Sequence, residues 1–329
     1  MSAIIEVKGL RKEFKIAKRK EGAFGAVRSL FSREYNTKVA VNEVTFAIQP
    51  GELVGYIGPN GAGKSTTIKM LTGILVPTAG DVRVRGLVPY ERRVENARQI
   101  GVVFGQRTQL WWDLPTVESF ELLQHIYKIP KQRYERNMTR FRELLGMDEF
   151  IQTPVRQLSL GQRMRADLAA ALLHDPEILY LDEPTIGLDV VAKEKIREFI
   201  LEINRERQVT VILTTHDMQD IEKICDRMIL IDKGTVIYDG PVAQIKERFG
   251  KARTLVVDLE PNGFGDRLEV EGAEQVKREG QRFWLRFNRD EVSASQLIAR
   301  VSERYAIHDL TVEEPAIEGI ISRIYQEGI

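Results

Sequence analysis

The sequence contains little cysteine and no long uncharged apolar run. Cys225 is the only cysteine among the 329 residues, which excludes a disulfide within the chain and fits a reducing compartment. No stretch of ~18 uncharged apolar residues occurs, so we expect no membrane-spanning helix in the chain itself. The first residues, MSAIIEVKGLRKEF, lack the apolar core of a secretion signal. If the protein works at a membrane, another polypeptide has to supply the crossing.

The sequence also lacks an excess of charge of one sign. Lys plus Arg and Asp plus Glu each number 48, so no overall field favours nucleic acid as a partner, and we expect none. An apolar content of 43% and a charged content of 29% are typical of a globular protein. The length suits two domains, or one large domain with an appendage.

Strand-like and helix-like segments alternate along most of the chain. AIIEVKGL and the runs on both sides of Pro50-Gly51 predict strands, and the last of these, ELVGYIG, leads into a glycine-rich loop. Helical spacing follows in STTIKMLTGIL and over most of Pro115 to Thr153. QIGVVFG, EILYLDEP and VTVILTTHD predict further strands, the last two typical of parallel strands buried on both faces. This alternation predicts an α/β core with active groups at the carboxyl ends of its strands.

The pattern changes beyond about Gly240. TLVVDLEP, RFWLRFN and IHDLTVEE predict strands, with Phe283, Leu285 and Phe287 on one face, and SASQLIARVSERY predicts a helix. A last helix follows. We therefore expect a large domain over residues 1–245 and a small accessory α+β domain over residues 250–329.

Residues 15–38 form an insertion of different character. They include seven basic residues against two glutamates, and they carry aromatic and aliphatic residues at helix-like spacing: Phe24, Val27, Leu30 and Phe31. This combination is typical of a solvated surface helix and also of a helix that lies on a membrane surface. Both alternatives stay open at the level of the sequence.

The run GPNGAGKST matches the phosphate-binding pattern G-x-x-x-x-G-K-[ST], with a predicted strand before it and a helix after it. Glycines let backbone N–H groups approach phosphate oxygens, and the helix adds its positive dipole end. Lys64 is predicted to reach the outer phosphates and Ser65 to ligate Mg²⁺. The alternative is a flexible surface turn that contains a lysine. The predicted loop consists of Gly58, Pro59, Asn60, Gly61, Ala62, Gly63, Lys64, Ser65 and Thr66.

Two adjacent carboxylates end the apolar strand ILYL. At a strand end, Asp182 is placed to hold a metal ion and Glu183 to orient and deprotonate an attacking water. A helix-capping acid is the alternative, but it explains one carboxylate and not both. His216 ends another apolar strand, where its ring is able to reach the same crevice. We expect His125, His174 and His308 to be ordinary surface or packing residues.

LSLGQRMRADLAAALL predicts a helix with Ser159 at its N-cap, and its exposed amides predict a second anion site. The order of glycine loop, Gln106, LSLGQ, strand-DE, Asp189 and strand-TTHD resembles the ATP-binding cassette (ABC) ATPases of membrane transporters. The resemblance extends over roughly Ile4 to Gly240. It implies a P-loop NTPase fold with a RecA-like core, an antiparallel β subdomain and a helical subdomain over about residues 107–160.

The resemblance implies that two cassettes pair head to tail, with ATP and Mg²⁺ between the glycine loop of one and the LSLGQ helix of the other. Gln106 then matches a glutamine that contacts Mg²⁺ or water. Asp182 and Glu183 match the metal and catalytic carboxylates, and His216 matches the histidine that contacts the γ-phosphate. The residues matched to the interface with the second cassette are Ser159, Gly161, Gln162 and Asp189.

Two positions depart from the family pattern. Leu160 stands in LSLGQ where the family usually has glycine. This residue affects the backbone geometry of the segment that is expected to contact the ATP of the partner. The aromatic residue that stacks on adenine normally follows the first strand. Phe14 matches by position, and Tyr35, at the far end of the insertion, is the alternative.

The resemblance also implies separate transmembrane permease subunits and a location at the cytoplasmic face of the cell membrane. Trp111 and Trp112 are candidates for contact with the permease, or for filling the core of the helical subdomain. The insertion and the ending VEEPAIEGIISRIY are similar to those of drug, lipid or polysaccharide exporters, so we favour export. The alternative function is a soluble ABC ATPase of translation or repair, but such proteins carry two cassettes or a long coiled coil.

Overall fold

Mixed α/β structure extends over both parts of the chain. The computed structural model describes residues 2–17, 35–105, 107–260, 268–315 and 317–327. Contacts divide the chain into two compact units, Met1–Asp239 and Gly240–Ile329. A parallel sheet in the first unit, together with a separate antiparallel sheet, confirms the predicted fold class.

The first unit contains most of the helices and strands. In chain order these are β1 (Ile5–Ala17), β2 (Tyr35–Ile48), β3 (Leu53–Ile57), α2 (Lys64–Leu71), β4 (Ala79–Val84), α3 (Arg93–Ala97), β5 (Ile100–Phe104), α4 (Thr116–Tyr127), α5 (Lys131–Leu145), the 3-10 turns Met147–Glu149 and Val155–Gln157, α6 (Leu160–Leu172), β6 (Ile178–Asp182), α7 (Val190–Arg207), β7 (Thr210–Thr214), α8 (Met218–Ile224), β8 (Arg227–Asp232) and β9 (Thr235–Pro241).

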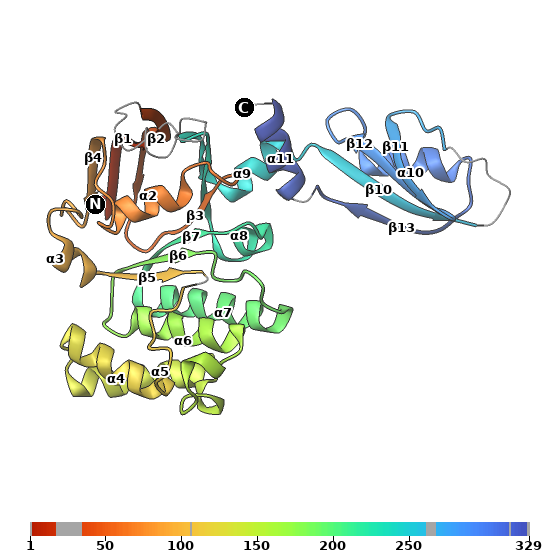
Figure 1. Cartoon of the computed structure of the whole chain (residues 1–329). Helices are drawn as coiled ribbons and strands as arrows, with labels where there is room; N and C mark the ends of the chain where they lie inside the picture. The colour runs from red at the N-terminus through yellow and green to blue at the C-terminus, as the bar shows by residue number, and fades with distance from the viewer. Residues whose placement is uncertain (1, 18–34, 106, 261–267, 316, 328–329) are drawn as a thin grey trace, which may run out of the picture. The chain divides into compact units, whose positions relative to one another are not determined.

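A six-stranded sheet with the order β5-β6-β7-β3-β8-β9 runs through the first unit (Figure 1). The pairs β5–β6, β6–β7, β7–β3 and β3–β8 are parallel. All five residues of β3 (LVGYI) and of β7 (TVILT) are buried, as expected for parallel strands that are covered on both faces. Because the strands are parallel, the loops that follow β3, β5, β6 and β7 all leave the sheet at the same edge.

Helices cover one face of this sheet. Figure 1 shows α6 and α7 against it and α4 and α5 beyond them. The alanine- and leucine-rich sequence of α6 allows close packing, and most of the helix is buried. The predicted helical subdomain therefore consists mainly of α4 and α5, which pack on α6 and α7.

An antiparallel sheet with the order β2-β1-β4 faces the other side of the six-stranded sheet. One apolar cluster joins both sheets and α2, and it includes Ile5, Phe46, Tyr56, Ile68 and Tyr180. Figure 1 shows α2 between the two sheets. The helix is thereby fixed in place by packing on both of its sides.

The two long strands of this sheet extend into the basic insertion. Ala17 pairs with Tyr35, so residues 15–17 and 35–38 continue β1 and β2 and are not helical as we expected. These ends form strands because their backbone groups pair with each other in the antiparallel register of β1 and β2. The apolar residues of the insertion that suggested a helix lie outside the described residues.

The second unit contains α9 (Val242–Phe249), β10 (Ala252–Leu259), β11 (Ala273–Glu279), β12 (Arg282–Asn288), α10 (Ala294–Ser302), β13 (Ile307–Glu313) and α11 (Ile317–Glu327). Its strands form an antiparallel sheet in the order β11-β12-β10-β13. Phe283, Leu285 and Phe287 are buried on one face, as the alternation in RFWLRFN predicted, and they form a core with Leu297 and Val301 of α10. In the described ranges, no helix of either unit has the length and apolarity that spanning a bilayer requires.

Gly80 lies at a close approach of β4 to β1. Its φ is +82°, and a Cβ there would lie 2.1 Å from the carbonyl oxygen of Gly9. Gly86 has a similar φ of +77° but no neighbour within 4 Å of a Cβ. Both alanine variants therefore carry the cost of the left-handed backbone, about 1–2 kcal/mol, and only Gly80→Ala adds a steric overlap.

We predict that Gly80→Ala lowers the free energy of unfolding by about 1–3 kcal/mol more than Gly86→Ala does. Urea unfolding followed by circular dichroism measures the difference. Equal losses in the two variants would contradict the close packing of β4 on β1.

Candidate functional site

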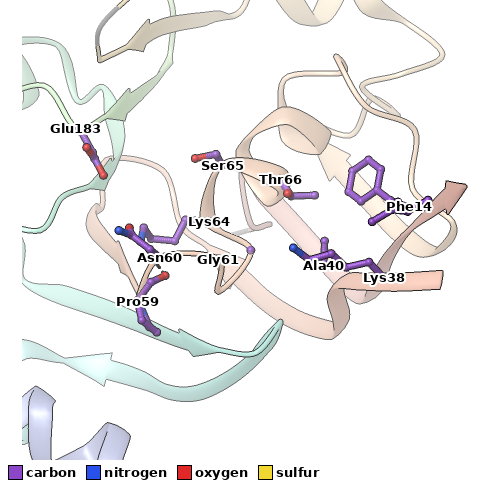
Figure 2. A pocket seen from close by; sticks show the side chains of 12 residues that line it. Phe14, Lys38, Ala40, Pro59, Asn60, Gly61, Lys64, Ser65, Thr66 and Glu183 are labelled. Atoms are coloured by element: carbon purple, nitrogen blue, oxygen red, sulfur yellow. Dashed lines mark hydrogen bonds between the residues drawn. The ribbon is translucent and has the colours of Figure 1, made fainter. Parts of the chain in front are cut away.

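A pocket of about 340 Å³ lies where the loop after β3 meets the carboxyl ends of the parallel strands. Figure 2 shows Glu183 at one end of the pocket and Phe14 at the other, with Lys64 and Ser65 between them. Most of the predicted phosphate loop lines it. The lining residues are Phe14, Ile16, Lys38, Ala40, Pro59, Asn60, Gly61, Gly63, Lys64, Ser65, Thr66 and Glu183.

Glycine is required at two positions of the loop by close backbone contacts. A Cβ on Gly58 would lie 2.5 Å from the carbonyl oxygen of Ile231, and a Cβ on Gly63 would lie 2.5 Å from that of Ala40. Gly63 also has a φ of +109° and forms the N-cap of α2. The first turn of α2 contains no acidic residue, so the positive end of the helix dipole faces the loop without compensation. The loop is therefore built to receive an anion.

Lys64 is folded into this loop with only 6% of its surface exposed. Its Nζ donates hydrogen bonds to the carbonyl oxygens of Gly58 and, at 3.3 Å, Pro59. Burial lowers the pKa of Lys64, while the nearby carboxylates of Glu183 and Asp182 act in the opposite direction. An anion bound in the pocket would favour the charged form of the ammonium group.

Asp182 and Ser65 bring two oxygen donors together at the edge of the pocket. Ser65 Oγ lies 3.3 Å from Asp182 Oδ2, and Thr214 Oγ1 donates to Asp182 Oδ1 at 2.5 Å. A hydroxyl and a carboxylate are hard ligands that suit Mg²⁺, which usually takes one or two carboxylates together with substrate phosphates. Within the described ranges, no group of three or more His, Cys, Asp or Glu residues is arranged to hold a metal by itself. The donor set therefore fits a magnesium ion that is shared with a phosphate.

Glu183 and His216 form a pair at the ends of β6 and β7. Glu183 Oε1 lies 2.8 Å from His216 Nε2. The backbone of Glu183 has a φ of +57°, and its N–H donates to the carbonyl oxygen of Thr214 at 2.9 Å. A left-handed backbone is uncommon outside glycine, and it is maintained here by contacts with the neighbouring strand. The glutamate lines the pocket, and both side chains remain partly accessible.

The residues predicted to meet a second cassette lie at the starts of α6 and α7. Ser159 and Gln162 form a capping box, with Ser159 Oγ accepting from Gln162 N at 3.2 Å and Gln162 Oε1 accepting from Ser159 N at 2.9 Å. Asp189 caps α7 by accepting from Ala192 N at 2.8 Å, and Gly161 packs against Ala192. In the described structure these residues do not contribute to the lining of the pocket of their own chain.

Gln106 lies outside the described residues, but the residues before and after it are held by hydrogen bonds to β6 and α6. The N–H of Gly105 donates to the carbonyl oxygen of Asp182 at 2.7 Å. Asp167 of α6 is buried and accepts from Thr108 Oγ1 at 2.8 Å and from Gln109 N at 3.1 Å. Burial raises the pKa of Asp167 to about 6, although these hydrogen bonds oppose the shift. Asp167 therefore anchors the segment that follows Gln106 to the helix that begins at Ser159.

Of the two candidate aromatics, Phe14 lines the pocket and Tyr35 does not contribute to its lining. Phe14 is 37% exposed, and Lys12 Nζ lies 5.4 Å from the centroid of its ring. Tyr35 lies three residues farther along the hairpin, paired with Ala17. The position of Phe14 at the end of the pocket opposite Glu183 therefore favours Phe14 as the stacking residue (Figure 2).

Lys38 and Ala40 line the pocket from β2, although the sequence did not predict them as site residues. The pairing of Phe14 with Lys38 brings them to the site. No local motif marks them, because they arrive through a pairing that spans the insertion. A prediction of the register of the β1–β2 hairpin would have found them.

The remaining histidines and the tryptophan pair lie elsewhere. His174 is buried, donates a hydrogen bond from Nε2 to the carbonyl oxygen of Ile100 at 3.1 Å, and stacks on Tyr127. Burial lowers the pKa of His174, which is consistent with a packing residue.

Trp111 and Trp112 are 38% and 51% exposed, so they do not simply fill the core of the helical subdomain.

Comparisons with known proteins agree with this geometry. A family model described as ABC transporter matches residues 41–186. The chain is 34% identical to the ABC transporter ATP-binding protein NatA of Bacillus subtilis over 208 residues, 63% of this chain and 84% of that protein. It is also 34% identical to the Nod factor export ATP-binding protein I of Rhizobium etli over 250 residues, 73% of this chain and 78% of that protein.

A solved structure has the same cassette fold. The dimeric ATP-binding cassette MJ0796, in a post-hydrolysis state with ADP and Pi, is 27% identical with a TM-score of 0.59, covering 72% of this chain and 98% of that one. The resemblance inferred from the order of the motifs is thus confirmed. The chain belongs to the ABC transporter family, as an ATP-binding protein with an ABC ATPase domain.

Proposed function

We propose that this chain hydrolyses ATP to drive a separate permease that exports a molecule across the cell membrane. The main support for this proposal is that Glu183, 2.8 Å from His216, lines the same pocket as Lys64 and Ser65. One pocket thus contains residues suited to bind phosphate, Lys64 and Ser65, and a carboxylate suited to act as a base, Glu183. The class of reaction is inferred from the family, and the roles of the residues are inferred from their positions in the pocket.

Each residue has a role that follows from its position. The amides of the loop and the ammonium group of Lys64 bind the β- and γ-phosphates, as in other phosphate loops. Ser65 Oγ and Asp182, through water, would hold Mg²⁺, which when bound neutralises charge on the phosphates. Gln106, next to the anchored Gly105, is assigned to the same ion or to the attacking water.

Glu183 orients the attacking water and accepts its proton. The water oxygen forms a bond to the γ-phosphorus, and the bond from that phosphorus to the bridging oxygen breaks, which leaves ADP and phosphate. His216 donates a hydrogen bond from Nε2 to Glu183 and steadies the carboxylate. His216 is also assigned to contact the γ-phosphate of ATP, because its partner Glu183 lines the pocket that contains Lys64.

A second copy of the chain completes the site, with its Ser159 helix over the nucleotide. The separation of Ser159, Gly161, Gln162 and Asp189 from the pocket of their own chain supports this assignment. Apolar residues beside Asp189 also support an interface, because Val190 and Val191 are 79% and 68% exposed and Ile186 is 40% exposed. The head-to-tail homodimer would cover them.

The permease is assigned to the helical subdomain, and through it the chain would lie at the cytoplasmic face of the membrane. Exposed tryptophans are strong interface anchors, and Trp112 lies on the surface with the guanidinium of Arg163 5.8 Å from its ring. The likeness to a Nod factor export protein supports the export direction.

Glu183→Gln is expected to bind ATP, to accumulate as a dimer with ATP and to lower kcat roughly 10²- to 10⁴-fold, because the base is lost while the phosphate grip stays. Steady-state phosphate release and size-exclusion chromatography with ATP measure these effects. Glu177→Gln is the matched control, since Glu177 precedes the same strand at its other end and pairs with Arg85. Turnover at the wild-type rate in Glu183→Gln would contradict the assignment.

The same variant tests the direction of transport. In inside-out membrane vesicles with the permease that co-purifies with the chain, the wild type is expected to accumulate the cargo with ATP, and Glu183→Gln is not. Accumulation in right-side-out vesicles with ATP enclosed in them, and none in inside-out vesicles, would show import and contradict export.

Phe14→Ala is expected to weaken ATP binding by about 1–3 kcal/mol, the usual value for an aromatic ring stacked on a base, and Tyr35→Ala is expected to leave it unchanged. Fluorescence titration with an ATP analogue measures both affinities. The reverse order of effects would assign adenine to Tyr35.

A further inference from the structure

Asp220, Arg197, Thr185 and Thr215 form a buried polar cluster, and the two threonines lie within two positions of Glu183 and His216 in the chain. Asp220 of α8 has no exposed surface, and Arg197 of α7 is 3% exposed. Thr185 and Thr215 are each 2% exposed, and both point their hydroxyl groups at Asp220. Burying a charged group costs free energy unless the group is paired and hydrogen-bonded, so Asp220 and Arg197 need defined partners in this cluster.

One carboxylate oxygen accepts both hydroxyl groups. Thr185 Oγ1 and Thr215 Oγ1 donate to Asp220 Oδ2, the latter at 3.0 Å. The other oxygen, Oδ1, accepts from Arg197 Nε at 2.7 Å. Arg197 in turn donates from Nη1 to Glu194 at 3.1 Å. The carboxylate of Asp220 therefore has a partner on each of its oxygens.

The two threonines stand next to the two residues of the catalytic pair. Thr185 follows Glu183 by two positions, and Thr215 directly precedes His216. Thr215 Oγ1 also accepts from the N–H of Asp217 at 3.0 Å, which fixes the backbone on the far side of His216. A shift of Asp220 would thus move the backbone on both sides of the contact between Glu183 and His216.

The cluster is placed where it can maintain the backbone conformation of Glu183. Glu183 has a left-handed φ of +57°, a conformation that persists only where the surroundings determine it. The side chains of Thr185 and Thr215 are buried, so their hydrogen bonds to Asp220 form in a region of low dielectric, where they hold their geometry more firmly than at the surface. Arg197 also ties the cluster to α7, the helix that follows the turn after Glu183.

We propose that Asp220, held by Arg197, is a positioning residue that sets the distance between Glu183 and His216 through Thr185 and Thr215. This inference rests on the proposed function only in taking Glu183 as the base for ATP hydrolysis. None of the four residues lines the pocket around Lys64, and they act by fixing Glu183, which does, and its partner His216. Thr185 and Thr215 together form the link, and loss of either hydroxyl releases one side of it.

Thr185→Val and Thr215→Val test the link with little change in shape. Each variant is expected to lower kcat for ATP hydrolysis roughly tenfold or more with an unchanged KM, because the phosphate grip does not involve the cluster. Thr185→Ser and Thr215→Ser keep a hydroxyl group and are expected to retain kcat.

Thr210→Val is the matched control. Thr210 is a buried threonine at the opposite end of β7, and its hydroxyl accepts from the N–H of Gly51 at 2.9 Å. This variant loses a comparable hydrogen bond far from the pair, so it is expected to lose stability and keep kcat. An equal fall of kcat in Thr210→Val would show a general structural effect and overturn the proposal, as would wild-type kcat in both threonine variants.

A second readout does not depend on hydrolysis. The chain contains four histidines, so the ring signals in a ¹H–¹³C spectrum are few, and His216→Gln identifies that of His216. Thr185→Val and Thr215→Val are expected to shift the His216 signal, and Thr210→Val is not. An unmoved signal would overturn the link even if ATP is not hydrolysed, whereas a shifted signal without wild-type hydrolysis would overturn the proposed function alone.

Discussion

The parallel register of β3, β6 and β7 is the constraint on which the site depends. Asp182 pairs with Thr214, and β3 pairs with β7, so the loop after β3 leaves the sheet beside the carboxylates at the end of β6. Lys64 and the start of α2 thus lie beside Asp182 and Glu183, and Lys64 and Glu183 line the same pocket of about 340 Å³. A bridging Mg-phosphate matches both sides.

The parallel register also separates the residues of the pocket from those assigned to a second chain. The residues proposed to bind phosphate and water follow β3 and β6, where the sheet fixes the backbone, whereas Ser159 and Asp189, which are proposed to serve a second chain, cap α6 and α7. Asp167 anchors the segment beside Gln106 to α6, and Asp220 anchors the Glu183 turn to α8. Two buried carboxylates therefore connect the segment after Gln106 and the turn after Glu183 to helices of the core.

Local patterns carried much of this information. The glycine loop, the strand-end carboxylates and the Ser159 cap were predictable because each depends on neighbouring residues in the chain. Lys38 and Asp220 were not, since they reach the site through a hairpin register and through the packing of α8, and neither stands in a motif. The helix expected in the insertion was wrong at its ends, where β1 pairs with β2, because that pairing joins residues far apart in the sequence.

The loop around Lys64 is assigned to enclose the phosphates of ATP. Calorimetric titration of Mg-ATP into the purified chain and into Lys64→Ala tests this assignment. We expect saturable binding near one ATP per chain in the wild type and little or none in the variant. Absence of binding in the wild type, or equal affinity in both, would contradict it.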